Sequence, residues 1–586
     1  MRRHGQSEEL GVRVEQSGLG IAGPQPDPLP RREGVSLSTQ HPSLITHHSS
    51  LTTRRRIPAL PTSTLLQIVL LAGIFLLNFF PGTDPDLWWH MATGRYIVDT
   101  GAIPRVDPFS YTAAGKPWIA HEWLAEVVMY MLYRLGGYLA LVLFFGSMVT
   151  LAFGIVLRTL RLLGLKAVAA AAITFWAAFM SLFGWDVRPQ IFSYLIFSLY
   201  LYLLLRSRKS ADRWLWLLPC LMILWVNLHA GYVMGLVLLA LFLAGEAINQ
   251  HSALSTQHSA PSTQNPELRT QNSALGPRRS SFRSYLSVAV ATVAATVVNP
   301  QGPAMLLYPF SYAGTQNASM KNITEWQSPD FHYYYFFVFG ISLMVLMVAP
   351  SRKRMDWALV LPLLALTAMS LQSVRVIPFY AIAVAPILAT RLAGGRGSEA
   401  GGQRAGDGEN PEPRTQNPEP NLITHHSSLI THHSPATPWN WLVLGLCLVT
   451  MASTLLSDRA QLGPEPLTTE YPVAGVRYLR ESGLKGNLLN TFHWGGFLIW
   501  SFYPERRVFV DGRPDMYGDQ FMEEYEKVQD ARPGWKEVLD RYQIEVALVE
   551  KDGRTATLLL ASGEWQELFR GNIESVLVRS NRQKEN

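Results

Sequence analysis

Apolar segments of nearly membrane length recur along the chain and constrain its fold more than any other feature. They lie at 61–80, 138–156, 167–183, 191–205, 214–226, 232–247, 285–298, 335–348, 357–371, 376–389 and 439–456. A membrane helix needs about 20 apolar residues, so several of these segments are short for a full crossing. The sequence predicts a mainly α-helical, polytopic transmembrane bundle of about 11 spans.

Composition agrees with this class of protein. Of 586 residues, 48% are hydrophobic and only 16% are charged, which is too apolar for an average soluble protein. The net charge of +6 does not predict nucleic-acid binding, because the basic residues form short clusters beside apolar segments rather than one face. Cys220 and Cys447 both lie in apolar segments and imply neither a disulfide framework nor a thiolate metal site. Residues 1–56 lack the pattern of a cleavable signal peptide, so the first span is expected to remain as an anchor.

Lysine and arginine concentrate in every second connection between the apolar segments. They include Arg54, Arg55, Arg56, Arg158, Arg161, Lys166, Arg206, Arg208, Lys209, Arg278, Arg279, Arg283, Arg352, Lys353, Arg354, Arg391, Arg396 and Arg404. By the positive-inside rule these connections are cytoplasmic, as is the N-terminus. We expect three regions in a bacterial-type inner membrane: a disordered cytoplasmic N-terminus at 1–60, the bundle at 61–456, and an extracytoplasmic domain at 457–586.

Three stretches predicted on the cytoplasmic side share one vocabulary of Ser, Thr, Gln, Asn and His. They are 35–53, 251–277 and 411–436, the last within an insert spanning 400–436. Such low-complexity sequence cannot bury enough apolar surface to fold, which favours disordered linkers. Their paired histidines could chelate a metal, but a spacer is the favoured interpretation, and no function is assigned to these stretches.

The connections predicted on the outer face hold the unusual polar residues. These residues are Asp84, Asp86, His90, Asp186, Arg188, His229, Glu325 and Arg375. Each has an ordinary explanation alone, since arginines snorkel at span ends, histidines bind backbone carbonyls and acids are solvated. Their joint restriction to one face predicts a site that uses cations for a phosphate and carboxylates for proton transfer or metal binding.

The densest of these motifs is Thr-Asp-Pro-Asp-Leu-Trp-Trp-His at 83–90, directly after the first apolar segment. It places two carboxylates beside an aromatic belt at the level of the lipid headgroups. This pattern is typical of a site that acts on a headgroup-level substrate, and equally of loop acids beside interfacial tryptophan anchors.

The segment after 456 has the pattern of a small α/β domain. Helices are predicted at 472–481, 518–530 and 534–542, strands at 486–491, 507–511, 544–550 and 575–579, and either a helix or an interfacial loop at 494–502. Ligands bind outside the carboxyl ends of strands in open α/β sheets, so Asp511, Arg513 and His493 are candidate contacts. A charged turn at 511–515 is also explained simply as a turn.

The first outer loop resembles that of a known superfamily. Asp86 opens an aromatic helix predicted at 87–99, which is followed by Thr-Gly-Ala-Ile-Pro-Arg at 100–105 and a second interfacial helix predicted at 121–133. This arrangement resembles the C-type (GT-C) membrane glycosyltransferases, which include protein mannosyltransferases, aminoarabinose transferases and RgtA/B/C/D-like bacterial enzymes. The similarity runs from about residue 65 to 578, but only the first loop is motif-like. Leu87 stands where the superfamily commonly has a second acid.

The resemblance implies transfer of a sugar from a polyprenyl-phosphate donor to a lipid, glycan or protein acceptor at the outer face, usually with inversion. Asp86 would be the general base and Asp84 would stabilise the oxocarbenium-like centre. Arg188 or Arg375 would stabilise the leaving phosphate. Further substrate contacts are expected from His90, Glu122, His229 and Glu325, with Glu126 as an alternative carboxylate. Asp84 and Asp86 could instead hold Mg²⁺ or Mn²⁺, although the metal-free version is favoured.

Two other classes of function remain open. A transporter or flippase for a lipid-linked or sugar substrate would place ionisable residues near span centres. The predicted spans are nearly free of such residues, with Glu246 near an inner end as the exception. The other class is a non-catalytic membrane assembly protein, with the bundle as an anchor. The polar residues crowded into the outer loops argue against it only moderately.

Overall fold

The computed structural model describes residues 60–79, 84–209, 213–258, 282–313, 324–348, 355–393, 440–446, 449, 453 and 465–580. The N-terminus predicted as disordered, the insert at 400–436, residues 259–277 and Cys447 lie outside these residues. The insert predicted from 251 is wrong at its start, because residues 251–258 continue a helix. Glycine and proline are absent from this stretch, so an established helix can propagate through it.

The bundle consists of helices that follow ten of the eleven predicted apolar segments. They are α1 (Thr62–Leu76), α3 (Trp123–Leu162), α4 (Ala167–Met180), α5 (Gln190–Ser207), α6 (Leu217–Leu228), α7 (Tyr232–His258), α9 (Phe282–Ala295), α12 (Tyr335–Val348), α13 (Trp357–Gln372) and α14 (Ile377–Ala393). The additional α10 (Ala304–Ala313) and the 3-10 turns η1 (Leu182–Gly184), η2 (Arg213–Trp216), η3 (Thr324–Trp326) and η4 (Val374–Val376) lie between them. Most of the eleventh segment lies outside the described residues.

Four helical stretches among the described residues are long and apolar enough to cross a membrane: Trp123–Leu162, Gln190–Ser207, Tyr232–Ser252 and Val374–Leu392. Further apolar helices are 10–17 residues long. The mainly helical membrane class is therefore confirmed, whereas the number of spans stays a prediction.

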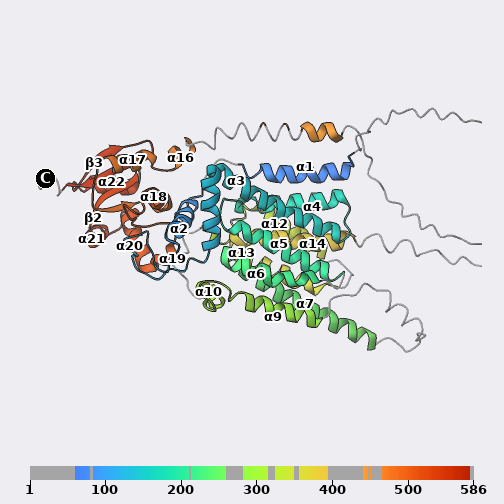
Figure 1. Cartoon of the computed structure of the whole chain (residues 1–586). Helices are drawn as coiled ribbons and strands as arrows, with labels where there is room; N and C mark the ends of the chain where they lie inside the picture. Colours follow the sequence, from blue (N-terminus) through green and yellow to red (C-terminus); the bar gives the residue numbers. More distant parts are fainter. Residues whose placement is uncertain are drawn as a thin grey trace, which may run out of the picture. The chain divides into compact units, whose positions relative to one another are not determined.

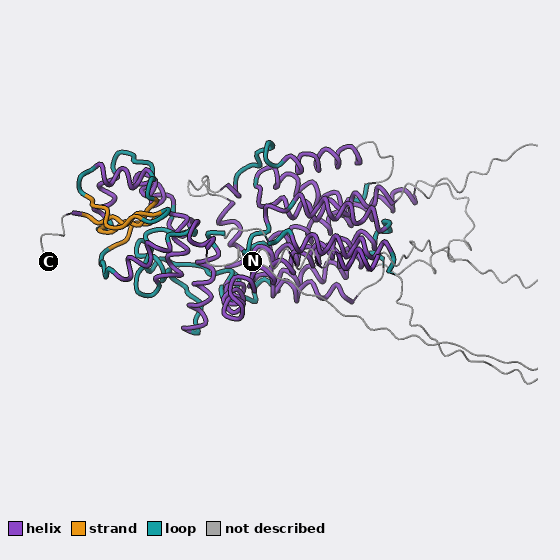
Figure 2. Tube along the Cα trace, turned by 90° about the horizontal axis from the view of Figure 1, so that it is seen from above, coloured by secondary structure: helices purple, strands orange, loops and turns teal. Residues whose placement is uncertain are grey.

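The long helices pack side by side through apolar faces (Figure 2). α3 contacts α1, α4 and α5, while α13 contacts α7 and α14. Small residues permit the closest approaches. A Cβ atom on Gly245 of α7 would overlap the backbone of Ala358 in α13. Close backbone contact of this kind is how membrane helices gain packing energy without a hydrophobic driving force.

Two helices in the first outer loop match the predicted interfacial helices. The first is α2 (Leu87–Thr100), and the second is the initial part of α3. α3 breaks at Gly136 and Gly137, whose backbone angles are not helical, and Gly137 has a φ of 64° that glycine adopts at little cost. Residues 123–135 and 138–162 are therefore two helices joined at a kink, and α2 packs on the first of them (Figure 1).

The basic connections meet at one end of the bundle. The side chain of Lys209 donates to the carbonyl of Leu162 at the end of α3. Arg208 pairs with Glu246 and Asp356, each at 2.6 Å. At the other end of the bundle, Glu122 at the start of α3 contacts His229 in the connection between α6 and α7. The alternation of basic and acidic connections is therefore present, while the side of the membrane that each end faces stays a prediction.

The C-terminal segment folds as a small α/β unit. Its helices are α16 (Glu465–Glu470), α17 (Val473–Glu481), α18 (Gly495–Phe502), α19 (Pro514–Tyr517), α20 (Asp519–Gln529), α21 (Trp535–Arg541) and α22 (Arg554–Ala561), with the 3-10 turn η6 (Phe492–Trp494). Strands β1 (Asn487–Asn490), β2 (Ile544–Glu550), β3 (Trp565–Arg570) and β4 (Glu574–Arg579) form one sheet in the order β1-β2-β4-β3. β1 and β2 are parallel, and the other two pairs are antiparallel.

The strand predicted at 507–511 is not part of this sheet. Val508 instead forms a bridge with Ser110 of the first outer loop. The Val508 amide donates to the Phe109 carbonyl at 3.1 Å, and the Tyr111 amide donates to the Val508 carbonyl at 3.1 Å. The structure has an isolated bridge at Val508 in place of the strand predicted at 507–511, and its hydrogen-bonding partners lie almost 400 residues away in the chain, which no local pattern can indicate.

The α/β unit and the first outer loop share one core. Trp88 of α2 makes edge contacts with Tyr471 and Phe497, at ring-centroid distances of 5.6 and 5.3 Å. Arg95 donates to the carbonyls of Trp500 and Tyr503 at 3.1 and 3.2 Å. The segment at 494–502 is thus a helix, α18, whose buried side lies on α2.

Candidate functional site

Arg188 contacts three of the predicted acids, Asp84, Asp86 and Glu325, and so forms one cluster with them. It contacts Asp84 at 3.4 Å between Nε and Oδ1, and it pairs directly with Asp86 and Glu325. Glu325 also pairs with Arg375 at 3.1 Å. These five residues, called here the carboxylate–arginine cluster, come from the turn before α2, the turn before α5, η3 and η4.

Asp86 is held by its side chain and does not cap α2. Its Oδ1 accepts a hydrogen bond from Trp89 Nε1 at 3.1 Å, while Oδ2 accepts from Arg188. The Asp86 amide itself donates to Asp84 Oδ1 at 2.8 Å. The Asp86 side chain accepts no hydrogen bond from a backbone amide in the first turn of α2, so it does not act as a helix cap. The predicted pair of acids is therefore one linked unit.

Burial sets the electrostatics of this cluster. Loss of solvent raises the pKa of Asp84 to about 7, even though Arg188 favours its ionised form. Burial likewise raises the pKa of Asp186. Burial also opposes ionisation of Glu325, but Arg188 and Arg375 together hold the pKa of its carboxyl below the usual range. The cluster holds three carboxyl groups, those of Asp84, Asp86 and Glu325, against two guanidinium groups.

Arg188 and Arg375 converge as expected, but they differ in how many of their hydrogen-bond donors are already paired. Arg188 is surrounded by carboxylates, including both that were named as possible metal ligands, and already supplies them with a positive charge. Arg375 stacks over Trp326, with its guanidinium carbon 5.0 Å from the ring centroid. Its Nε is buried and has no hydrogen-bond partner among the described residues. Arg375 therefore has the freer donor for an incoming anion.

A second group, the histidine–carboxylate cluster, consists of His90, His121, Glu122, Glu126 and His229. His90 Nδ1 lies 3.5 Å from Glu122 and 3.3 Å from Glu126. The Nε2 atoms of His121 and His229 each lie 3.4 Å from Glu122 Oε1. Burial lowers the pKa of His90 to about 3 and that of His229 to about 4, so both rings are neutral at pH 7.

The tautomer of His229 follows from its neighbours. Its Nδ1 accepts the backbone amide of Gly231 at 2.9 Å and lies 2.7 Å from Ser193 Oγ. The proton must therefore be on Nε2, directed at Glu122. His121 was not among the sequence-predicted site residues, although its position beside Glu122 was a signal. The predicted contacts His90, Glu122 and His229 are brought together in this cluster. The fourth predicted contact, Glu325, lies in the carboxylate–arginine cluster.

The turn at 511–513 has a structural role. Arg513 is 3% exposed and binds Asp511 at 2.7 Å and Asp107 of the first outer loop at 3.1 Å. Its guanidinium lies 4.6 Å from the ring centroid of Trp118. Asp511 and Arg513 thus join two parts of the protein, and their contact with a ligand stays a prediction. Between them, a Cβ on Gly512 would overlap Asp86 Oδ1, so the backbone of this turn abuts the carboxylate–arginine cluster, which the sequence did not indicate.

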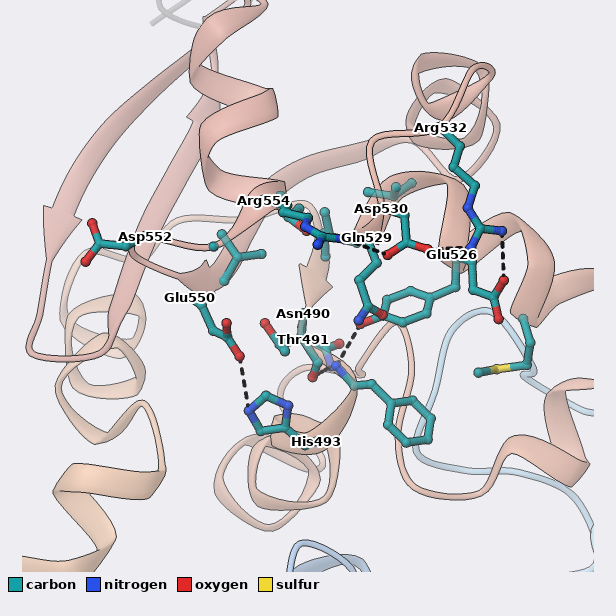
Figure 3. Close-up of a pocket in the computed structure, with 18 residues that line it drawn as sticks. Asn490, Thr491, His493, Glu526, Gln529, Asp530, Arg532, Glu550, Asp552 and Arg554 are labelled. Atoms are coloured by element: carbon teal, nitrogen blue, oxygen red, sulfur yellow. Dashed lines mark hydrogen bonds and ion pairs between the residues drawn. The ribbon is translucent and has the colours of Figure 1, made fainter. Parts of the chain in front are cut away.

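A separate cavity of about 720 Å³ opens within the α/β unit (Figure 3). It lies beyond the carboxyl ends of the parallel strands β1 and β2, where ligands bind in open α/β sheets. His493 and Glu550 lie beside one another on its wall, with Nε2 and Oε1 3.5 Å apart. Arg532 and Arg554 lie on the other wall. Of the three candidate contacts, His493 lines this cavity, and Asp511 and Arg513 do not.

Comparison with known proteins gives few matches. No protein-family model matches the chain, and no curated protein matches it. Among solved structures it is similar to the archaeal oligosaccharyltransferase AglB from Archaeoglobus fulgidus, in complex with an inhibitory peptide and a dolichol-phosphate (12% identity, TM-score 0.47, 83% of this chain and 69% of that chain). The apo form of the A. fulgidus oligosaccharyltransferase gives a TM-score of 0.46 over the same shares, also at 12% identity. Similarity at this level assigns neither a family nor an activity to this chain.

Proposed function

We propose that the protein is a membrane glycosyltransferase of the GT-C type, which moves a sugar from a polyprenyl-phosphate donor to an acceptor at the outer face. The observation that carries this proposal is the convergence of Asp84, Asp86, Arg188, Glu325 and Arg375 at the ends of apolar helices. Acids and a donor-bearing arginine at headgroup level match the needs of a lipid-linked glycosyl phosphate.

In the proposed reaction Asp86 accepts the proton of the acceptor hydroxyl. It is the more exposed of the two acids, at 20% of its side chain against 10% for Asp84. The acceptor oxygen forms a bond to the anomeric carbon as the bond to the phosphate oxygen breaks, and the bonding electrons leave with the phosphate. Asp84 and the surplus of carboxylates stabilise the oxocarbenium-like centre.

Arg375 binds the departing phosphate through its Nε, which has no partner in the described part of the chain, whereas Arg188 positions the acids. The positive charge of Arg188 between Asp84 and Asp86 supports a metal-free version of this site, rather than Mg²⁺ or Mn²⁺ bound there. The sugar and the acceptor, whether lipid, glycan or protein, are left open by these contacts.

The transport alternative is less well supported. Among the described helices, ionisable residues lie near the ends of the apolar stretches, as Arg206 does in α5, and Glu246 in α7 is paired with Arg208. The remaining alternative, an inactive assembly protein, is separated by the assay below.

The test is an assay in native membranes with a pool of radiolabelled polyprenyl-phosphate sugars. Overproduction of the wild type should increase acid-stable label in an acceptor, and Arg375→Lys should reduce it because the planar donor fork is lost. Arg391→Lys is the matched control, because Arg391 lies in the last turn of α14, the helix that follows η4, at the far end from Arg375. Label that crosses the membrane while remaining on the donor would favour a transporter, and no change in either would favour an assembly protein.

A further inference from the structure

The histidine–carboxylate cluster is built from one face of each of two helices. His90 and Gly94 lie one turn apart in α2, and Glu122 and Glu126 lie one turn apart at the start of α3. A Cβ on Gly94 would overlap the backbone oxygen of Glu126. The glycine therefore lets the two backbones touch, and this close approach brings the imidazole of His90 between the two carboxylates.

The distances from His90 Nδ1 to the two carboxylates are typical of ligands around one metal ion. His90 Nδ1 lies 3.3 Å from Glu126 Oε1 and 3.5 Å from Glu122 Oε2, and the ligand atoms of the three residues all lie within 4.8 Å of one another. Two ligands bound at 2.0–2.1 Å to a tetrahedral ion are separated by about 3.3 Å. Both distances from His90 are thus within about 0.2 Å of the separation expected of ligands that share one ion.

One carboxylate oxygen of the cluster lacks a hydrogen-bond partner among the described residues. Glu126 is 1% exposed, and its Oε2 is buried without a hydrogen-bond partner among the described residues. Neither Glu122 nor Glu126 forms an ion pair with a lysine or arginine in the described part of the chain. Two buried carboxylates without a cation are costly, because burial penalises ionised groups that lack compensation.

The remaining oxygen of Glu122 is already oriented. Its Oε1 faces the Nε2 atoms of His121 and His229, each at 3.4 Å, while Oε2 faces His90. The Nε2–H of His229 is a donor that can orient a ligating carboxylate from behind. His121 and His229 therefore serve as positioning residues around a centre made by the other three.

We propose that His90 Nδ1, Glu122 Oε2 and Glu126 hold one divalent metal ion, with Zn²⁺ the best match to one imidazole and two carboxylates. Three protein ligands leave a fourth position open. This site is distinct from the carboxylate–arginine cluster and does not depend on the proposed glycosyl transfer. Because the His90 amide donates to the Asp86 carbonyl at 3.2 Å, an ion here would also fix the turn that carries Asp86.

The experiment uses the full chain in nanodiscs, stripped with a chelator and reloaded with Zn²⁺. Metal analysis should find one equivalent of Zn²⁺ in the wild type. Zn²⁺ loading should also raise the thermal unfolding temperature of the wild type. Glu126→Gln, which keeps the size of the side chain, should weaken Zn²⁺ binding by more than about 100-fold, since changes even to outer-shell partners cost 10–100-fold. Glu325→Gln in the other cluster is the matched control and should bind as the wild type does.

X-ray absorption at the zinc edge keeps the proposal testable if Glu126→Gln fails to fold. The loaded wild type should show nitrogen and oxygen neighbours at about 2.0 Å with the outer-shell scattering of one imidazole. Absence of stoichiometric Zn²⁺ in the wild type, or a shell without imidazole, would overturn the proposal. Loss of binding in Glu325→Gln but not in Glu126→Gln would place the ion in the carboxylate–arginine cluster instead.

Discussion

Asp86 makes two side-chain interactions that an amide can partly preserve. Asn at this position keeps an oxygen for Trp89 Nε1 and removes the negative charge that faces Arg188. Arg188 keeps Asp84 and Glu325 as partners, so Asp86→Asn should leave the fold intact. If Asp86 is the general base, transfer of radiolabelled sugar in membranes should fall by about 100-fold or more. Near-normal transfer would move the base to Asp84.

Asp84 should make stability depend on pH. Its pKa is raised from 3.8 to about 7 by burial, so the folded state holds the proton more tightly than the unfolded state. This stabilising contribution is complete below pH 3.8 and is lost as pH rises to about 7. Thermal unfolding between pH 4 and 8 should therefore show the wild type losing stability relative to Asp84→Asn as pH rises. Asp330→Asn, at an exposed acid, is the control, and parallel curves for Asp84→Asn and the wild type would contradict the prediction.

At the scale of elements, glycines decide how closely the helices approach. Gly94→Ala adds a methyl group against the Glu126 backbone, and overpacking of this kind typically costs about 1–3 kcal/mol. Gly73→Ala in α1 is the matched control, because a Cβ there meets no atom within 4 Å and alanine favours a helix by about 1 kcal/mol. Thermal unfolding in detergent should show a loss of stability for the first variant only. Equal behaviour of the two would mean that α2 and α3 are not in close contact.

At the scale of the whole molecule, the alternating basic connections predict its orientation. In a chain with Cys220 and Cys447 replaced by serine, an impermeant thiol reagent applied to intact cells should label Glu523→Cys and not Ser427→Cys. Glu523 is an exposed residue of α20, so its labelling depends only on the side of the membrane. Labelling after membrane disruption supplies the control for reactivity. The reverse pattern would place the α/β unit in the cytoplasm and exclude an outer-face reaction.

Local sequence determined most of the elements of this protein. Apolar segments form helices because a bilayer leaves no other partner for the backbone. The helices α17, α20 and α21 and the strands β1, β2 and β4 also lie where their periodicity predicted. β3 and α22 were missed, and β3 has charged, partly exposed residues that obscure the alternation expected of a strand.

The candidate site was determined by sequence only as a set of residues. That Asp84, Asp86, Arg188, Glu325 and Arg375 belong on one face followed from the order of the spans. Tertiary structure decided which of them touch, that Arg188 lies between the acids, and that Arg375 Nε has no hydrogen-bond partner among the residues the structure describes.

Tertiary structure alone also brought Val508 to Ser110, Gly512 to Asp86 and His90 between Glu122 and Glu126. The physical reason is the range of the interactions. Helix formation and membrane partition depend on neighbours within a few turns of the chain, whereas a hydrogen bond or an ion pair between distant loops depends on the packing of every element between them.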